Sequence, residues 1–347
     1  MNNNILIAGI GGASLGTEIF KNLALAGYRN IYGADISPYA FGLYQEGFLE
    51  TFVVDRKKYI RDIYTICKKA NIGIIIPGGE GPQILLHEER ELFKKNGIIL
   101  ATNSPEVIGL CTDKIRTFDY LSEKGVPVPM TKIINTPAVL DDFPYPCIIK
   151  PTRDSGGSAF VSFANNKKDA RICADQIIKS GRDPILQEYL PLTEGEYSFS
   201  VLSAPSGELF GGVGIKKNFD TKLNYTFKSD EAIISGGYSQ GLISIFPEIF
   251  SQVCQISKIL NSCGPLNIEG RVIKGKFFPF EINPRFSATT HLWAKAGFND
   301  VDYFIRLLSN VSIDKKPSIT EGFCLRSFTE IFIPKDELKG VYNVGQE

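Results

Sequence analysis

Two glutamates and an asparagine fall near the ends of two expected strands in residues 264–286. Glu269 lies in the first strand, and Glu281 and Asn283 lie near the exit of the second, an aromatic-rich strand that we expect to pack into a core. Mg²⁺ usually takes one or two carboxylates and lets phosphate and water complete its octahedron. Because Arg285 follows two positions after Asn283, the pattern predicts a Mg²⁺ site that binds together with a polyphosphate.

The register of this hairpin decides whether the two glutamates can share a cation. If Lys274 and Gly275 alone form the turn, Glu269 pairs with Phe280 and the two glutamates face opposite sides of the sheet. A longer connection, over residues 274–276, pairs Glu269 directly with Glu281. We expect this second pairing, or a bulge with the same effect.

Lysines at two further places suit phosphate binding. Lys150 ends a short strand expected over residues 146–151, and the segment TRDSGGSAFV follows, with another strand over 160–163. A lysine followed by a glycine loop can clamp phosphate oxygens, with Ser155, Gly156 and Gly157 closing over them. The alternative is a hairpin turn with a solvated lysine. Lys114, at the start of a helix that begins after residue 111, is on this segment alone equally well explained as a surface lysine.

The strand expected over residues 185–190 breaks at a proline, so its last backbone groups are free to bind an adenine edge. Gln187, Glu188, Tyr189 and Leu190 form this hinge. Glu196 begins the next strand and could accept hydrogen bonds from ribose hydroxyls, or be a simple edge-strand acid. Strands over 195–204 and 207–215 then lead to Lys216, a candidate catalytic lysine, and Lys217.

The first hundred residues alternate apolar runs with helical patterns, which predicts a doubly wound parallel sheet. Gly9, Gly11 and Asp35 resemble a dinucleotide-binding fingerprint, but Ser14 stands where its third glycine is expected and Gly16 comes two positions late. NAD(P) binding, a substrate-facing loop and plain tight-turn geometry all remain open. Glu80 lies where open α/β sheets place ligands, as a substrate contact or a solvated turn acid. The expected elements are strands at 5–8, 31–34, 51–54, 72–76 and 98–101, with helices at 57–70 and 82–96.

The rest of the chain shows a mixed pattern. Residues 218–245 are polar and glycine-rich and predict a long loop. Helices are expected over 247–263, 290–296 and 301–308, and a late strand over 323–333. His87 and His291 are the only histidines, so a histidine-based triad or zinc site has little support, and His291 is expected in a packing or substrate-adjacent position.

Composition limits the class of protein. The 347 residues are 43% hydrophobic, and 38 basic residues balance 38 acidic ones, so the overall charge gives no reason to expect nucleic acid or an anionic membrane as a partner. The seven cysteines are spaced far apart without a CxxC pair, which favours reduced thiols in a cytoplasmic protein. No apolar run is long enough to predict a membrane span.

The ordered set TDKIRTF, IIKP, SGG, QEYL, GEY, NIEGR and FEINPRFS resembles the ATP-grasp superfamily, specifically its carbamoyl-phosphate-synthase-like carboxylate–amine ligases. The resemblance implies a Rossmann-like pre-ATP-grasp domain over residues 1–110, with a doubly wound parallel sheet. Two α+β subdomains follow: a small one with the glycine loop over 111–190 and a large one with the metal hairpin over 191–333, then a tail over 334–347.

The same resemblance implies roles for individual residues. Lys114 and Lys150 contact ATP phosphates under the loop 154–158, and residues 187–190 hold adenine. Glu196 holds ribose, and Glu269, Glu281 and Asn283 bind Mg²⁺. Arg285 lies near the transferred phosphoryl group or the substrate carboxylate. In this family a carboxylate attacks the γ-phosphate, and an amine captures the acyl phosphate.

Some departures narrow the function. The glycine loop lacks the arginine that many relatives carry, FSA replaces the common FSG, and no glutaminase segment is visible. We therefore predict an ATP- and Mg²⁺-dependent ligase for a small carboxylate and an amine. Alternatives are carbamoyl-phosphate-type phosphorylation of bicarbonate or carbamate, an NAD(P)-binding oxidoreductase, and a non-catalytic ATP-binding protein. A homodimer is compatible with an α/β enzyme of this size.

Overall fold

The computed structural model describes residues 4–12, 15–153, 158–313 and 317–341. The chain forms two compact units: an N-terminal unit of residues 1–103, 285–318 and 326–347, and a second unit of residues 104–284 and 319–325. Ser155, Gly156 and Gly157 lie outside the described residues. In the described part of the chain, no helix combines the length and the apolar character that crossing a membrane requires.

The N-terminal unit is built on a parallel five-stranded sheet in the order β3-β2-β1-β4-β5, which confirms the doubly wound sheet expected from the sequence. Apolar side chains on both faces of the central strands are buried, as is usual in parallel sheets. Helices α9 and α10 return late in the chain to pack against α1. The elements are β1 (Asn4–Ala8), α1 (Leu15–Leu25), β2 (Ile31–Asp35), β3 (Glu50–Val53), α2 (Tyr59–Lys69), β4 (Ile72–Pro77), α3 (Glu80–Glu88), α4 (Arg90–Lys95), β5 (Ile99–Leu100), α9 (Thr290–Lys295) and α10 (Asp300–Leu308).

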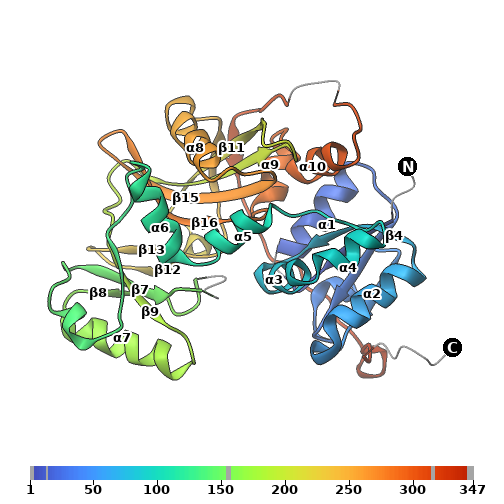
Figure 1. The fold of residues 1–347 in the computed structure, drawn as a ribbon, viewed down its shortest axis with the longest axis horizontal. Helices are drawn as coiled ribbons and strands as arrows, with labels where there is room; N and C mark the ends of the chain where they lie inside the picture. The colour runs from blue at the N-terminus through green and yellow to red at the C-terminus, as the bar shows by residue number, and fades with distance from the viewer. Residues whose placement is uncertain (1–3, 13–14, 154–157, 314–316, 342–347) are drawn as a thin grey trace. The chain divides into compact units, whose positions relative to one another are not determined.

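The second unit contains a four-stranded antiparallel sheet in the order β6-β9-β7-β8. Helix α7 packs on one face of this sheet (Figure 1) and buries Ala170, Ala174 and Ile177 against it. This small sheet carries the lysine and the hinge singled out in the sequence. Its elements, with the two helices that precede it, are α5 (Pro105–Cys111), α6 (Lys114–Glu123), β6 (Thr131–Ile133), β7 (Cys147–Pro151), β8 (Ser162–Ala164), α7 (Lys167–Lys179) and β9 (Pro184–Glu188).

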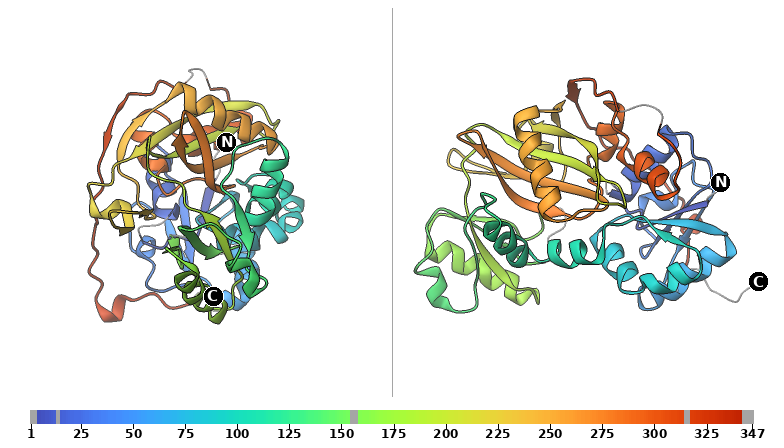
Figure 2. Two further views of the ribbon diagram at one scale, coloured as in Figure 1. Left: turned by 90° about the vertical axis from the view of Figure 1, so that its left-hand side faces the viewer. Right: turned by 45° about the horizontal axis from the view of Figure 1, so that its top comes forward.

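A six-stranded sheet in the order β16-β15-β10-β11-β14-β17 and a two-stranded sheet of β12 and β13 complete the sheets of the second unit. Helix α8 lies across one face of the six-stranded sheet (Figure 2), where its side chains meet Phe199 and Phe277 in an apolar core. The opposite face carries polar side chains of β10 and β15, among them Glu196 and Glu269, together with buried apolar side chains of β11 such as Val213 and Ile215. The elements are β10 (Glu196–Ser203), β11 (Leu209–Lys217), β12 (Tyr225–Lys228), β13 (Ile233–Ser235), β14 (Gly241–Ser244), α8 (Pro247–Ile259), β15 (Pro265–Ile273), β16 (Lys276–Asn283) and β17 (Gly322–Cys324).

Several expected elements differ from those observed. Residues 218–245 are not a long loop, because β12 pairs with β13 and β14 joins the six-stranded sheet. The late strand ends at Cys324 instead of continuing to residue 333, since only Gly322, Phe323 and Cys324 find partners on β14. The single helix expected over 82–96 is two helices, α3 and α4. The subdomain boundaries stay a prediction.

Candidate active site

The hairpin of β15 and β16 brings its two glutamates together. Glu269 pairs directly with Glu281, and Asn267 pairs with Asn283, so all four side chains share one face of the sheet. The turn is the two-residue one, Lys274–Gly275, with positive φ at both positions, as type I′ turns require. A bulge at Phe280, which has no partner on β15, restores the register. The expectation of a shared face is therefore confirmed through the bulge.

Polar contacts hold these side chains in place. The Asn283 amide donates to Glu281 at 3.2 Å, and the Asn267 amide donates to Glu269 at 3.1 Å. Lys217 Nζ donates to the other oxygen of Glu269 at 2.6 Å. No group of three or more His, Cys, Asp or Glu side chains suited to a metal occurs among the described residues. Two carboxylates and an amide fit Mg²⁺ that takes its remaining oxygens from phosphate and water.

Lys150, at the end of β7, is a buried cation beside this acidic face. Only 4% of it is exposed, and its Nζ donates to the Phe280 carbonyl at 2.9 Å, which the bulge leaves outside the β15–β16 ladder. Burial and, after it, the positive charge of Lys114 lower the pKa of Lys150 to about 7, although the negative charges of Glu281 and Glu269 oppose the shift. A nearby anion would therefore stabilise the charged form of Lys150.

Lys114 is brought close to Lys150, although the two are far apart in sequence. Asp113 caps α6 by accepting from the backbone N–H of Arg116, and this cap places Lys114 at the first helical position. Both the backbone N–H of Lys114, at 3.2 Å, and its Nζ, at 3.5 Å, donate to the Thr152 carbonyl, just after β7. The structure thus brings together the two lysines predicted for phosphate binding.

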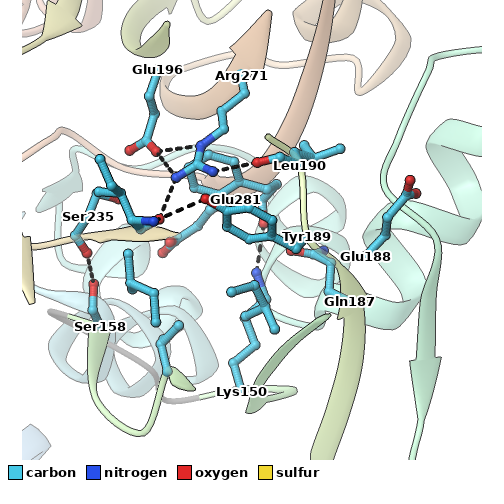
Figure 3. A pocket seen from close by; sticks show the side chains of 15 residues that line it. Lys150, Ser158, Gln187, Glu188, Tyr189, Leu190, Glu196, Ser235, Arg271 and Glu281 are labelled. Carbon is cyan, nitrogen blue, oxygen red and sulfur yellow. Dashed lines mark hydrogen bonds and ion pairs between the residues drawn. The ribbon is translucent and has the colours of Figure 1, made fainter. Parts of the chain in front are cut away.

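A pocket lies between the small sheet and the six-stranded sheet of the second unit (Figure 3). Apolar and polar side chains both line it, and the expected hinge forms one wall. Beyond Glu188, the chain leaves β9 and pairs no further with β6 or β7. The lining residues are Ile148, Lys150, Ser158, Val161, Gln187, Glu188, Tyr189, Leu190, Glu196, Ile233, Ile234, Ser235, Arg271, Phe280 and Glu281.

Hydrogen bonds to neighbouring strands hold the hinge side chains. Gln187 is buried and its amide donates to Thr131 Oγ1 at 3.1 Å, while the Glu188 carboxylate accepts from the backbone N–H of Met130 at 3.1 Å. The Tyr189 hydroxyl accepts from the backbone N–H of Ile233 at 3.0 Å, on β13. Adenine binding by the hinge stays a prediction, with the backbone after Glu188 as the available edge.

Glu196 is completely buried and paired with two cations. Lys217 Nζ lies 3.1 Å from one carboxylate oxygen, and the Arg271 guanidinium lies 2.9 Å from the other. Burial alone would raise the pKa of this carboxyl, but Lys217 and Arg271 outweigh burial and lower it. Glu196 lines the pocket, and a contact between Glu196 and ribose stays a prediction.

The two remaining candidates lie elsewhere. Lys216 is exposed, and its Nζ lies 5.6 Å from the centroid of the Tyr197 ring. Neighbouring residues of a strand point to opposite faces, so Lys216 and Lys217 lie on different faces of the sheet. Lys217, not Lys216, therefore contacts Glu269. Arg285 donates to the Phe286 carbonyl at 2.8 Å and belongs to the N-terminal unit, so its role at a phosphoryl group stays a prediction.

The glycine loop of the N-terminal unit is explained by close packing. A Cβ on Gly16 or on Gly78 would come within 1.8 Å of the Gly9 carbonyl oxygen. Asp35 accepts from the backbone N–H groups of Ile10 at 2.8 Å and Ser37 at 3.0 Å, so the acid of the dinucleotide-like pattern anchors the loop itself. These contacts favour the tight-turn interpretation. A substrate role for Glu80, the first residue of α3, stays a prediction.

Sequence reasoning missed three side chains of this site: Asn267, Lys217 and Arg271. Asn267 and Arg271 lie two residues to either side of Glu269, and strand alternation puts them on its face. That spacing was an available signal for both. Lys217 was indistinguishable from Lys216 until the orientation of β11 was known.

Comparison with known families identifies the architecture. The model of a PylC-like N-terminal domain matches residues 5–101, and the model of the ATP-grasp domain matches residues 111–289, slightly more than half of the chain. The chain belongs to the ATP-grasp family. The recognition made from the ordered sequence motifs is therefore confirmed, as are the expected two-part fold and its α/β and α+β classes.

Several known proteins resemble this chain at low identity. The arginine-specific carbamoyl phosphate synthase large chain of rice chloroplasts is 24% identical over 257 residues, which are 70% of this chain and 22% of that protein. A biotin carboxylase–β,γ-ATP complex from Campylobacter jejuni has a TM-score of 0.68 at 14% identity, over 91% of this chain and 73% of the other. An L-amino acid ligase from Bacillus licheniformis gives 0.66 at 14% identity, over 91% and 75%.

These likenesses support the fold. The chain spans about a fifth of the length of the curated relatives it matches.

Proposed function

We propose that this ATP-grasp protein is an ATP- and Mg²⁺-dependent ligase that activates a small carboxylate as an acyl phosphate and joins it to an amine. One observation supports this above the others: the buried cation Lys150 and the carboxylate of Glu281 line the same pocket, and Glu269 stands opposite Glu281. A cation and two carboxylates beside a partly apolar cleft suit a triphosphate that carries its own divalent ion.

Different residues would bind the phosphates, the base and the metal ion of the nucleotide. Lys150 and Lys114 neutralise the phosphates, and the hinge Gln187–Leu190 presents backbone groups to the base. Closure of Ser155, Gly156 and Gly157 over the phosphates remains part of the proposal. Glu269, Glu281 and Asn283 would hold Mg²⁺, which when bound offsets the charge that develops during phosphoryl transfer.

In this reaction the protein has to position the substrates and stabilise negative charge. The substrate carboxylate is the nucleophile, so no protein side chain needs to form a covalent bond. Lys150 is well suited to stabilise the charge on the phosphoryl oxygens, because its ammonium is already removed from water and is not screened by it. Water exclusion also protects an acyl phosphate from hydrolysis until an amine arrives.

A screen for ADP release tests the proposal. Purified protein is incubated with ATP and Mg²⁺ and with pairs drawn from amino acids and small organic acids; bicarbonate forms its own arm because it marks the carbamoyl-phosphate-type alternative. We expect release that requires Mg²⁺ and a carboxylate, and its loss in Glu281→Ala and Lys150→Ala. Exposed matched controls, Glu123→Ala and Lys179→Ala, should stay active.

Other outcomes would contradict the proposal. ATP binding without turnover for any acceptor would make the chain a non-catalytic nucleotide-binding protein. A reduced nicotinamide whose fluorescence changes on saturation with protein would favour the oxidoreductase alternative. We also carry forward a cytoplasmic location and a homodimer as proposals, which fractionation and light scattering can test.

A further inference from the structure

Arg326 reaches from the late part of the chain to the segment that follows the β15–β16 hairpin. Its guanidinium donates to the Ala288 carbonyl at 2.5 Å and lies 3.4 Å from the Glu18 carboxylate, and its side chain is only 13% exposed. All three residues belong to the N-terminal unit. The family models match residues 5–101 and 111–289, so Arg326 lies outside both matched stretches.

Residues 284–289 connect β16 to α9, and other contacts hold the two ends of this connection. Near its start, the Phe286 ring is buried and packs edge-on against Phe304 of α10. Just beyond its end, Thr290 Oγ1 accepts from the Asn22 amide at 2.8 Å. Arg326 therefore holds the middle of a connection whose ends are already fixed.

The side chain of Arg285 depends on the backbone of this connection. Its guanidinium donates to the Phe286 carbonyl at 2.8 Å, so a rotation of the peptide units between residues 286 and 288 would move the carbonyl and the guanidinium together. Arg285 also follows Asn283 by two residues, which span at most about 7 Å of chain. Its backbone therefore stays close to the end of the acidic hairpin.

An arginine suits the position of residue 326, and Glu18 orients it. A planar guanidinium can donate to a carbonyl and to a carboxylate at fixed angles, whereas an ammonium group is a point charge. Glu18 is buried, and its other oxygen lies 2.7 Å from Lys21 Nζ. Because Glu18 would keep Lys21 as a cation after the loss of Arg326, we expect Arg326 variants to fold.

We propose that Arg326 is a positioning residue: by fixing the Ala288 carbonyl, it sets the direction of Arg285 toward the phosphoryl group that ATP transfers. This inference rests on the proposed function, because it assumes that Arg285 meets that group. Arg326 itself touches neither nucleotide nor substrate in this role. The C-terminal segment is anchored a second time, where Lys339 Nζ donates to Thr51 Oγ1 at 2.5 Å. That second anchor supplies a control on the same segment.

The test needs no knowledge of the acceptor. Trifluoroberyllate (BeF₃⁻) takes the place of a transferred phosphoryl group beside ADP, so its Kd at saturating MgADP reports the cationic side chains at that place. The Kd of MgADP alone reports the rest of the nucleotide site. Both are measured by titration calorimetry for wild type, Arg285→Met, Arg326→Met, Arg326→Lys, Glu18→Gln and the double variant Arg285→Met/Arg326→Met, with Lys339→Met as control.

We expect Arg285→Met and Arg326→Met each to weaken BeF₃⁻ binding by roughly tenfold or more, and to leave the Kd of MgADP within about twofold of wild type. Arg326→Lys should lose less, because its ammonium can still reach one acceptor. Glu18→Gln should also lose less, since Arg326 keeps the Ala288 carbonyl. The double variant should bind BeF₃⁻ no more weakly than Arg285→Met, because Arg326 acts only through Arg285. Lys339→Met should bind both probes like wild type.

The contrary results are separate. Wild type that binds no MgADP overturns the proposed function and this inference together. Wild type that binds MgADP but not BeF₃⁻ overturns the inference alone, as does normal BeF₃⁻ binding in Arg285→Met or Arg326→Met. Losses that add in the double variant would mean that Arg326 acts independently of Arg285, and an equal loss in Lys339→Met would mean that only anchoring of the segment matters; either overturns the positioning role. Should Arg326→Met fail to fold, Arg326→Lys decides by the same comparison with Arg285→Met.

Discussion

Lys150 gives the sharpest prediction, because its buried ammonium should make ATP binding take up a proton. Burial and the positive charge of Lys114 bring the pKa of Lys150 to about 7, against the opposing influence of Glu281 and Glu269. A triphosphate beside it favours the charged form and should return the pKa to its ordinary range, near ~10.4. The nucleotide therefore binds the protonated lysine, and above pH 7 that proton must come from solvent.

The size of the effect follows from the two pKa values. With a pKa of about 7 in the free protein, roughly half of the lysine is charged at pH 7 and about one per cent at pH 9. ATP affinity should therefore fall about fifty-fold over this range, or ~2.3 kcal/mol. Below pH 7 the same group raises the affinity by at most a further factor of about two, because half of it is already charged at pH 7. The sign is fixed, because a lysine with a lowered pKa releases its proton as pH rises through 7.

Titration calorimetry in buffers of different ionisation enthalpy, at saturating Mg²⁺, measures the proton count directly. We expect uptake of close to one proton at pH 9. Lys150→Arg is the matched variant, because a guanidinium does not titrate in this range and should bind with little pH dependence. Wild-type affinity that stays constant from pH 7 to 9, with no proton uptake, would refute this account of Lys150.

Three further predictions address the metal, the loop and the fold. Glu281→Gln should raise the Mg²⁺ concentration for half-maximal ADP release by more than roughly tenfold, and Glu269→Gln less, because Lys217 already neutralises Glu269; equal shifts would contradict this ranking. Gly16→Ala should cost up to about 3 kcal/mol in denaturant unfolding, since its Cβ meets the Gly9 carbonyl, while Gly81→Ala, with nothing within 4 Å, should not. Burial lowers the pKa of His291 to about 4, so stability should fall as pH drops from 6.5 towards 4, and less in His291→Gln.

Much of the site could be predicted because its parts are local in sequence. Each motif can be interpreted from a few adjacent residues. The motifs are a strand that ends in lysine, a strand that ends before proline and a hairpin with two acids. Even the pairing of Glu269 with Glu281 followed from requiring one shared face, although the device was a bulge and not a longer turn. Because side chains alternate between the two faces of a strand, the register decides whether both carboxylates can face one cation.

The remainder depends on contacts between distant segments. Arg271 donates hydrogen bonds to the Leu190 and Ile233 carbonyls, which come from two distant parts of the chain. No residue near Arg271 in the sequence predicts these partners. Residues 218–245 were misjudged for the same reason: β14 is a strand because β11 offers it an edge, and β12 and β13 are strands because they pair with each other. The choice between Lys216 and Lys217 needed the orientation of β11.

The bulge at Phe280 has a consequence for how this hairpin can change in length. Because the register is reset there, residues added or lost at the tip, around Lys274, need not disturb the acidic face if the strands beyond the bulge keep their pairing. Loss of Phe280 itself would remove the bulge and the carbonyl that receives Lys150, although Glu281 would then take the place of Phe280 and stay opposite Glu269. Among homologous hairpins, insertions and deletions should therefore gather at the tip and spare the bulge residue before the second glutamate.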